Sequence, residues 1–379
     1  MPLYDSGTSE VGDPRGIGAE GLVVAIQANY YRVRLDADDP CTREQILLCT
    51  RRARLKKTGQ QVMVGDRVLV EAIDWADGRG AIAALHPRQT LLDRPPVANA
   101  DQILLVFALA DPAPDPQQMG RFLVKAEATG VPVSLCLNKQ DLVSADTQRY
   151  WQDQLHQWGY GPTMLSVQGG AALDGLKAQL CDRTTVIAGP SGVGKSSLIN
   201  RLIPQARLRT GAVSGKLGRG RHTTRHVELF ELPEGGFLAD TPGFNQPDLA
   251  LSPLNLGQCF PEIRQRLTLD TCQFNDCLHR GDPGCAVGTD WPRYEFYLTL
   301  LEEAAEYEED RLQQGDPDAA LKVRMGEKGQ RHHEPRLQTK KYRRPSRRRQ
   351  KQDLDELCHS LDAHMDPLEP QIEGEAPLD

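Results

Sequence analysis

Long apolar runs are missing from this chain of 379 residues. The longest, residues 103–110, is far shorter than the ~20 residues that a helix needs to cross a bilayer. The first residues include Asp5, Glu10 and Asp13 and no apolar segment, so they do not form a secretory signal. These absences argue against a membrane protein, and we expect a cytoplasmic monomer.

Cysteine is sparse, with nine residues in the whole chain. Without an export signal, a reducing compartment is expected and disulfides are not. Four metal-ligating residues nevertheless cluster within a short stretch, as Cys272, Cys277, His279 and Cys285. Three thiolates and one imidazole make a closed tetrahedral set, which predicts one structural Zn²⁺ rather than a catalytic metal. The alternative is a chance grouping of buried cysteines.

Each of two stretches near the C-terminal end lacks charged residues of one sign. Residues 336–351 contain nine Lys or Arg and no acid, whereas residues 353–379 contain nine Asp or Glu and no base. The two runs cancel within the formal net charge of -7, which therefore says little about the folded part. The basic run could bind phosphate backbone, or the acidic run could neutralise it.

Short alternating strands dominate the first part of the chain. Five runs with Gly and Asp turns between them predict a small β-barrel, for which we prefer an OB-type barrel over other small antiparallel folds. These runs are residues 22–26, 30–35, 46–48, 67–73 and 81–85.

After Pro95-Pro96, which we interpret as a linker, strands alternate with helices, as is typical of a parallel sheet. Beyond about residue 252 the pattern is helical. The predicted class is therefore a multidomain protein with an OB-type barrel, a central α/β P-loop domain and a helical zinc-binding domain. The expected parts are a flexible start (1–16), the OB-type barrel (17–92), the α/β domain (93–250), the zinc domain (251–330) and a disordered basic then acidic tail (331–379).

The sequence GPSGVGKS at 189–196 fits the P-loop pattern and lies between a predicted strand and a predicted helix. Its glycines let backbone N–H groups turn toward phosphate oxygens, and the helix N-terminus adds partial positive charge. Lys195 is expected to contact the β- and γ-phosphates and Ser196 to ligate Mg²⁺. The expected nucleotide contacts here are Ala188, Gly189, Pro190, Ser191, Gly192, Val193, Gly194, Lys195, Ser196 and Ser197.

The base is chosen by the tetrapeptide Asn138, Lys139, Gln140 and Asp141, which follows a predicted buried strand. The Asp141 carboxylate can accept from both N1–H and the exocyclic amine of guanine, a donor pair that adenine lacks. Ser166 and Val167 precede a Gly-rich turn and are candidates for backbone contacts to the base. A surface turn would explain the tetrapeptide alone, but not its combination with a P-loop.

Asp240-Thr241-Pro242-Gly243 follows an apolar strand, so Asp240 fits a carboxylate on the Mg²⁺ side and the Gly243 N–H fits the γ-phosphate. Thr223 or Thr224 is the expected switch ligand of Mg²⁺. Phe244 stands where many GTPases have the glutamine that orients water. His222 is our candidate for that role, since imidazole can accept from water near neutral pH, with a loop or RNA contact as the alternative.

The motif order is rotated, because the base-recognition motifs precede the P-loop. A rotated chain can still build the same sheet, since domain ends often lie close together. The segment around Asp240 then leads straight into the Cys/His domain. We therefore hypothesise that this domain responds to the nucleotide state.

Together these motifs resemble the RsgA (YjeQ/YloQ) family of circularly permuted, small-ribosomal-subunit-dependent GTPases over residues 17–315. The motifs that carry the resemblance are Pro87-Arg88, Arg94-Pro95, Asn138–Asp141, Gly189–Ser197, Gly220–Thr224, Asp240–Phe244 and the Cys/His cluster. The resemblance implies subunit-stimulated GTP hydrolysis with Mg²⁺, late 30S maturation, contact with 16S rRNA and release of an assembly factor. It also matches Phe244 and His222 to the family's hydrophobic and switch histidine positions, while the tail departs from the family pattern.

Two other functions remain open from the residues. One is an RNA-binding adaptor that holds GTP and scarcely hydrolyses it, which Phe244 would allow. The other is a P-loop kinase or ATPase, against which Asn138–Asp141 argues.

Overall fold

The structure is a computed structural model of the full chain, and it forms two compact units, Met1–Asp310 and Arg311–Asp379. Only the backbone is described at residue 240 and beyond residue 310. The described residues are 18–27, 30–36, 46–57, 59–93, 95–170, 172–204, 227–240, 251–314, 321–325 and 331–335. The expected flexible start at 1–16 lies outside them.

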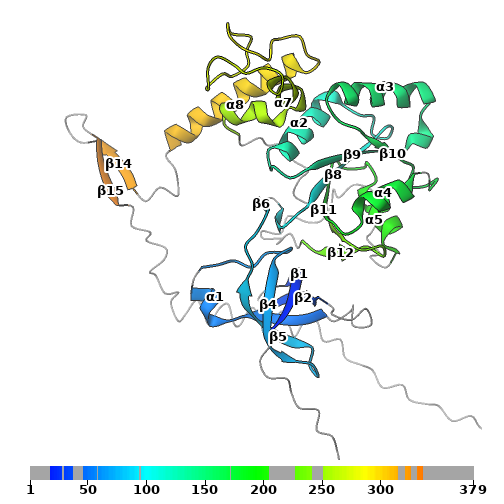
Figure 1. The fold of residues 1–379 in the computed structure, drawn as a ribbon, viewed down its shortest axis with the longest axis vertical. Helices are drawn as coiled ribbons and strands as arrows, with labels where there is room; N and C mark the ends of the chain where they lie inside the picture. The colour runs from blue at the N-terminus through cyan, green and yellow to red at the C-terminus, as the bar shows by residue number, and fades with distance from the viewer. Residues whose placement is uncertain are drawn as a thin grey trace, which may run out of the picture. The chain divides into compact units, whose positions relative to one another are not determined.

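The first part of the larger unit is a closed five-stranded barrel (Figure 1). Neighbouring strands follow the order β1-β2-β3-β5-β4, with β1 also paired to β4 and with β3 parallel to β5. This arrangement confirms the predicted OB-type barrel. The strands are β1 (Ala19–Gln27), β2 (Tyr30–Leu35), β3 (Ile46–Arg51), β4 (Arg67–Asp74) and β5 (Arg79–Leu85), and the short helix α1 (Ala53–Lys57) follows β3.

Strand β1 is buried on both faces. Val23 points into the barrel core with Val33 and Val68, whereas Leu22 and Val24 belong to a second core that continues into the α/β sheet. A strand covered on both sides needs consecutive apolar residues rather than an alternating pattern. The barrel is therefore packed against the sheet and is not merely tethered to it.

The segment expected to be a linker is a two-stranded hairpin instead. Strands β6 (Leu91–Asp93) and β7 (Pro96–Ala98) pair antiparallel, and Leu92 and Val97 are buried in the core that the barrel shares with the sheet. Pro96 is tolerated because it is the first residue of its strand. The prolines thus mark a turn rather than a free connection.

The α/β part contains a six-stranded sheet in the order β10-β9-β8-β11-β13-β12. All neighbouring pairs are parallel except β12 with β13. The central strand β8 is buried along its whole length, as its apolar sequence predicts. The strands are β8 (Gln102–Ala108), β9 (Val133–Asn138), β10 (Thr163–Met164), β11 (Thr184–Ala188), β12 (Leu229–Glu231) and β13 (Phe237–Asp240).

Helices cover this sheet on both faces. Met119 and Phe122 of α2 (Pro116–Glu127) and Leu155 of α3 (Ala145–Gln157) belong to one core, whereas Leu176 of α4 (Leu173–Leu180) and Leu198 of α5 (Lys195–Leu202) belong to another. Helix α2 begins after Asp115, whose carboxylate accepts from the N–H of Gln117 at 2.9 Å. The rotated chain order therefore produces an ordinary sheet with two covered faces.

The last part of the larger unit is helical, with α6 (Pro253–Leu256), η4 (Gly257–Cys259), α7 (Pro261–Leu267) and α8 (Tyr294–Gln314). Its core surrounds Phe260 and includes Val124 of α2. The buried Arg293 donates to Glu262 at 2.7 and 2.6 Å, and its guanidinium lies 5.0 Å from the Trp158 ring centroid, beyond the end of α3. These contacts fasten the helical part to the α/β part.

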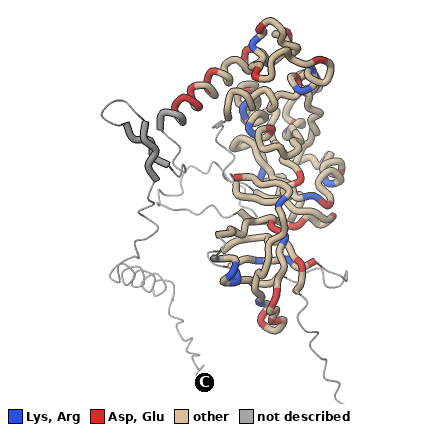
Figure 2. The backbone as a smooth tube through the Cα atoms, turned by 60° about the vertical axis from the view of Figure 1, so that its left-hand side comes forward, with Lys and Arg blue, Asp and Glu red and all other residues tan. Residues whose placement is uncertain are grey.

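Helix α8 carries a row of acidic residues along its second half (Figure 2). One of them, Glu303, forms an ion pair with Arg121 of α2. No helix within the described ranges is long and apolar enough to cross a membrane.

The smaller unit contains strands β14 (Leu321–Met325) and β15 (Arg331–Pro335), which pair antiparallel. Strand β15 lies in the segment 331–379 that low apolar content predicts to be disordered, and the expectation for this tail stays a prediction. Low apolar content argues against a packed core, but it does not prevent a two-stranded backbone ladder.

Candidate functional site

The P-loop joins the end of β11 to the start of α5. Its backbone is left-handed at Gly189 and Gly194, with φ of 139° and 97°. A Cβ at Gly189 would overlap the carbonyl oxygen of Val106, and one at Gly194 would overlap the amide nitrogen of Asn138. Lys195 donates from Nζ to the carbonyl oxygens of Gly189 and Pro190 at 2.8 and 2.6 Å. The ammonium therefore lies against the loop, and its contact with phosphate stays a prediction.

Asn138, the last residue of β9, connects three loops. Its Nδ2 donates to the carbonyl oxygen of Val193 in the P-loop at 2.9 Å, and its Oδ1 accepts from the N–H of Val167 at 3.2 Å. The side chain is almost fully buried. Two segments far apart in the chain, around residues 138 and 193, therefore meet through one amide.

The rest of the base-recognition motif forms a tight turn. Lys139 has a left-handed backbone, with φ of 62°, and its Nζ donates to the carbonyl oxygen of Asp111. The Gln140 N–H donates to the carbonyl oxygen of Leu165 at 3.2 Å. Asp141 is exposed within the turn Gln140–Leu142, so its carboxylate is accessible to a base.

The Ser166 loop completes this edge of the sheet. Ser166 is buried, and its Oγ accepts from the N–H of Gly169 at 2.9 Å, which closes the turn that presents Val167. Ligands of open α/β sheets bind at the carboxyl ends of the strands, where the loops after β9, β10 and β11 lie together. The expected residues 138–141, 166–167 and 188–197 are thus brought to one edge.

Asp240 ends β13, and its backbone is in register with Ile187 of the strand that leads into the P-loop. Its side chain is outside the description, and so are Gly243, Phe244, His222, Thr223 and Thr224. The magnesium and water-positioning assignments therefore stay predictions, with the backbone of Asp240 at the expected edge.

Two supporting residues escaped the sequence-based reasoning. Asp111 follows the buried strand β8 and accepts from Lys139, and Gln148 of α3 donates to the carbonyl oxygen of Gln140 at 2.8 Å. The position of Asp111 at the carboxyl end of a parallel strand is a signal that could have identified it. Nothing in the local pattern distinguishes Gln148 from any exposed glutamine.

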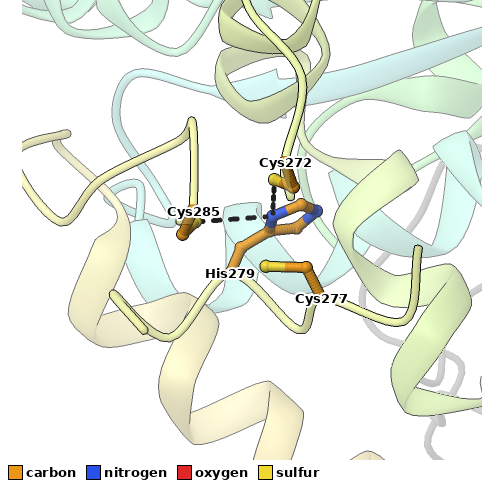
Figure 3. A group of neighbouring side chains, drawn as sticks. All are labelled: Cys272, Cys277, His279 and Cys285. Carbon is orange, nitrogen blue, oxygen red and sulfur yellow. Dashed lines mark hydrogen bonds between the residues drawn. The ribbon is translucent and has the colours of Figure 1, made fainter. Parts of the chain in front are cut away.

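The four predicted metal ligands converge on one point (Figure 3). Their ligand atoms all lie within 4.8 Å of one another, and Nδ1 of His279 is 3.6 Å from Sγ of Cys272 and 3.8 Å from Sγ of Cys285. A tetrahedral zinc with ordinary bond lengths places sulfur and nitrogen ligands roughly 3.6 Å apart. The donor set therefore fits Zn²⁺ in both chemistry and spacing.

Protonation at this cluster also suits a metal. Burial lowers the pKa of His279, which favours the neutral imidazole. Burial raises the pKa of the Cys277 thiol to about 11. For Cys285, burial acts to raise the pKa, but hydrogen bonds from the backbone of Gly288 and Val287 outweigh it and lower the pKa. The lowered pKa makes Cys285 easier to deprotonate than Cys277, and a bound cation would displace the protons of the thiols.

Comparisons with known proteins agree with this geometry. The family model described as RsgA GTPase matches residues 85–250. The small ribosomal subunit biogenesis GTPase RsgA of Trichormus variabilis is 58% identical over 355 residues, covering 89% of this chain and 96% of the relative. The small ribosomal subunit biogenesis GTPase RsgA of Synechocystis is 54% identical over 359 residues, covering 90% of this chain and 96% of the relative.

Two solved structures have a similar fold. The crystal structure of YjeQ from Thermotoga maritima has a TM-score of 0.65 and 29% identity, and it covers 76% of this chain and 99% of that one. The structure of YloQ, described as a circularly permuted GTPase, has a TM-score of 0.63 and 30% identity. The match covers 76% of this chain and 96% of the YloQ chain. The predicted rotation of the GTPase domain is therefore confirmed at the level of the fold.

Proposed function

The chain belongs to the RsgA GTPase family and is a GTP hydrolase, and from this premise we propose that it acts in the biogenesis of the small ribosomal subunit. In this proposal the subunit stimulates hydrolysis late in 30S maturation, and GTP turnover accompanies release of an assembly factor. The barrel and the Cys/His domain contact 16S rRNA. The relatives named for this process are matched over nearly their whole length.

The observation that carries the proposal is the position of Asn138. Its amide bonds to the P-loop and to the Val167 loop, so one guanine nucleotide can contact all three segments. Asp141 then accepts from N1–H and the exocyclic amine of the base, and Lys195 contacts the phosphates. Bound Mg²⁺ neutralises phosphate charge, with Ser196, Asp240 and Thr223 or Thr224 as its protein ligands.

The Cys/His cluster contributes stability rather than chemistry. Four protein ligands leave no open position on zinc, so the ion holds the knuckle between α7 and α8. His222 remains our candidate for positioning the attacking water, because Phe244 has no polar group to do so. The domain bounds given above at 17–92, 93–250 and 251–330 are part of this proposal.

The decisive experiment measures phosphate release from GTP with and without purified small ribosomal subunits. We expect a large rise in kcat with these subunits and none with an equal concentration of large subunits. A Lys195→Ala protein reports the background of contaminating hydrolases. Equal rates with and without small subunits would contradict the proposal and favour an RNA-binding protein that merely holds GTP.

A further inference from the structure

The barrel contacts the α/β sheet at one particular strand, β12, which forms the sheet edge. Ala25 of β1 and Glu228, just before β12, form an antiparallel bridge. Leu22 and Val24 of β1 share a core with Val227 and Leu229. Barrel strand β1 therefore extends the sheet edge and protects it.

Two arginines of barrel strand β2 hold the edge strand β12 at both of its ends. Nη1 of Arg32 lies 2.7 Å from Oε1 of Glu228, and Nη2 of Arg34 lies 2.8 Å from Oε1 of Glu231. The Arg34 guanidinium also lies 5.2 Å from the ring centroid of Phe237, the first residue of β13. Arg34 thus contacts both strands of the β12–β13 hairpin.

This hairpin leads directly to the chemistry. Glu231 pairs with Phe237 and Leu229 with Ala239, so Glu228 lies at the end of the hairpin where β13 finishes with Asp240. Asp240 in turn is in register with Ile187 of β11, two residues before Gly189 of the P-loop. A continuous series of paired strands therefore connects the barrel, β12, β13 and the P-loop strand.

We propose that Arg32 and Arg34 are positioning residues for GTP hydrolysis. They hold the β12–β13 hairpin against the barrel and thereby fix Asp240 relative to the P-loop. A displacement of the barrel, as when it contacts a large partner, is passed through these two ion pairs to the catalytic edge. This inference builds on the proposed role of Asp240 at Mg²⁺.

The proposal predicts that loss of these arginines affects turnover but not nucleotide binding. The guanine base and the phosphates are held by the loops after β9, β10 and β11, which the two arginines do not support. Loss of either arginine should therefore lower kcat and leave the affinity for GDP nearly unchanged. A general loss of folding would lower both.

The first experiment compares Arg32→Ala, Arg34→Ala and the double variant with wild type in steady-state GTP hydrolysis. Arg52→Ala is the matched control, because Arg52 forms a 2.8 Å ion pair with Glu71, another residue of the barrel domain, and both side chains are partly exposed. We expect kcat to fall about three- to tenfold in the Arg32 and Arg34 variants. KM and the Kd for a fluorescent GDP should change by less than about twofold, and Arg52→Ala should resemble wild type.

A second experiment exchanges the charges. Arg32→Glu alone places like charges together and should be at least as slow as Arg32→Ala, whereas Arg32→Glu combined with Glu228→Arg should recover most of the lost kcat. Unchanged kcat in the alanine variants, a parallel loss of GDP affinity, or failure of the exchange to recover turnover would overturn the proposal.

Both experiments are run without ribosomal subunits and then with them. The comparison without subunits tests the arginines even if wild type shows no stimulation, in which case only the proposed ribosomal function fails. If wild type is stimulated and the variants match it in both conditions, the role of the arginines is wrong and the ribosomal function stands.

Discussion

At the scale of single residues, Asn138 is the side chain on which the nucleotide site depends most. Its amide satisfies one acceptor in the P-loop and one donor in the Val167 loop; the first bond is buried and the second is partly buried. A buried polar group that loses its partner costs about 1–3 kcal/mol. Asparagine suits the position because its short side chain ends in an amide, which offers a donor and an acceptor in one plane.

Replacing Asn138 with alanine should weaken GDP binding by about 2 kcal/mol, which corresponds to roughly a 30-fold higher Kd. The carbonyl of Val193 and the N–H of Val167 lose their partner, and both loops become less well positioned. Fluorescence titration with a labelled GDP measures the change. Gln179→Ala is the control. The Gln179 amide donates to the Ser134 hydroxyl at 2.7 Å, and this bond is not part of the nucleotide loops. Equal Kd values for the two variants would contradict this prediction.

Asp141 should determine which base is bound. In Asp141→Asn the side chain still accepts from N1–H, but its NH₂ faces the exocyclic amine of guanine and can donate instead to the C2 carbonyl of xanthine. We expect GDP affinity to fall by roughly 100-fold and xanthosine diphosphate affinity to rise. Asp146→Asn, an exposed carboxylate paired with Arg149 on α3, should change neither Kd. A variant that still prefers GDP would show that Asp141 does not contact the base.

At the scale of elements, the knuckle that carries the Cys/His cluster connects α7 to α8. Its loop is held by the Gln273 N–H, which donates to Gly284 at 2.9 Å, and by the Tyr297 hydroxyl, which donates to Leu278 at 2.6 Å. The Tyr294 hydroxyl also donates to the Arg280 carbonyl at 2.9 Å, and Arg266 donates to the Val287 carbonyl at 2.6 Å. Each such bond contributes about 1 kcal/mol, whereas binding of a structural zinc can contribute about 10–16 kcal/mol. The metal is therefore expected to provide most of the local stability.

Removal of zinc should unfold this segment while the nucleotide site survives. After chelation, amide hydrogen exchange should accelerate in residues 257–301 and stay slow in β11 and α5, and GDP affinity should change by less than about twofold. Cys277→Ser should behave like the chelated protein, and Cys181→Ser, outside the cluster, should behave like wild type. Protection of residues 257–301 in protein shown by metal analysis to be zinc-free would contradict the prediction.

Local patterns predicted some elements and missed others for identifiable reasons. The P-loop pattern predicts a helix directly after it, and α5 (Lys195–Leu202) is that helix. Helix α4 was missed although Leu173, Leu176 and Leu180 have helical spacing, because the helix is short and contains Gly175. The consecutive apolar residues of β1 indicate burial on two faces, but they do not reveal that β12 covers one of them.

The residues of the site could be predicted from the sequence, but the contacts between them could not. The P-loop and the tetrapeptide Asn138–Asp141 identify the residues that are expected around the nucleotide. That the Asn138 amide bonds to Val193, or that Arg34 spans Glu231 and Phe237, depends on how distant strands meet. Such contacts follow from tertiary packing, for which a single sequence contains no local signal.

At the scale of the whole molecule, the rotated chain order connects the last two strands at one edge of the GTPase sheet to different partners. Barrel strand β1 contacts β12 at the sheet edge, and β13 leads to α6 of the helical part, with residues 241–250 between Asp240 and Leu251. The hairpin β12–β13 thus contacts the barrel through β12, and the chain continues from β13 into the helical part that carries the Cys/His cluster. An unrotated GTPase would place neither connection there.

This arrangement leads to a prediction for the complete cycle. If nucleotide state changes affinity for the small subunit, the subunit must change the ratio of the affinities for a GTP analogue and GDP by the same factor, because the two binding events share one thermodynamic cycle. We expect a factor of roughly 5 to 150, typical of coupled sites. Subunit affinity is measured by co-sedimentation with each nucleotide, and nucleotide affinity by fluorescence with and without subunits. Equal subunit affinity in both nucleotide states would show that neither the barrel nor the zinc-binding part responds to hydrolysis.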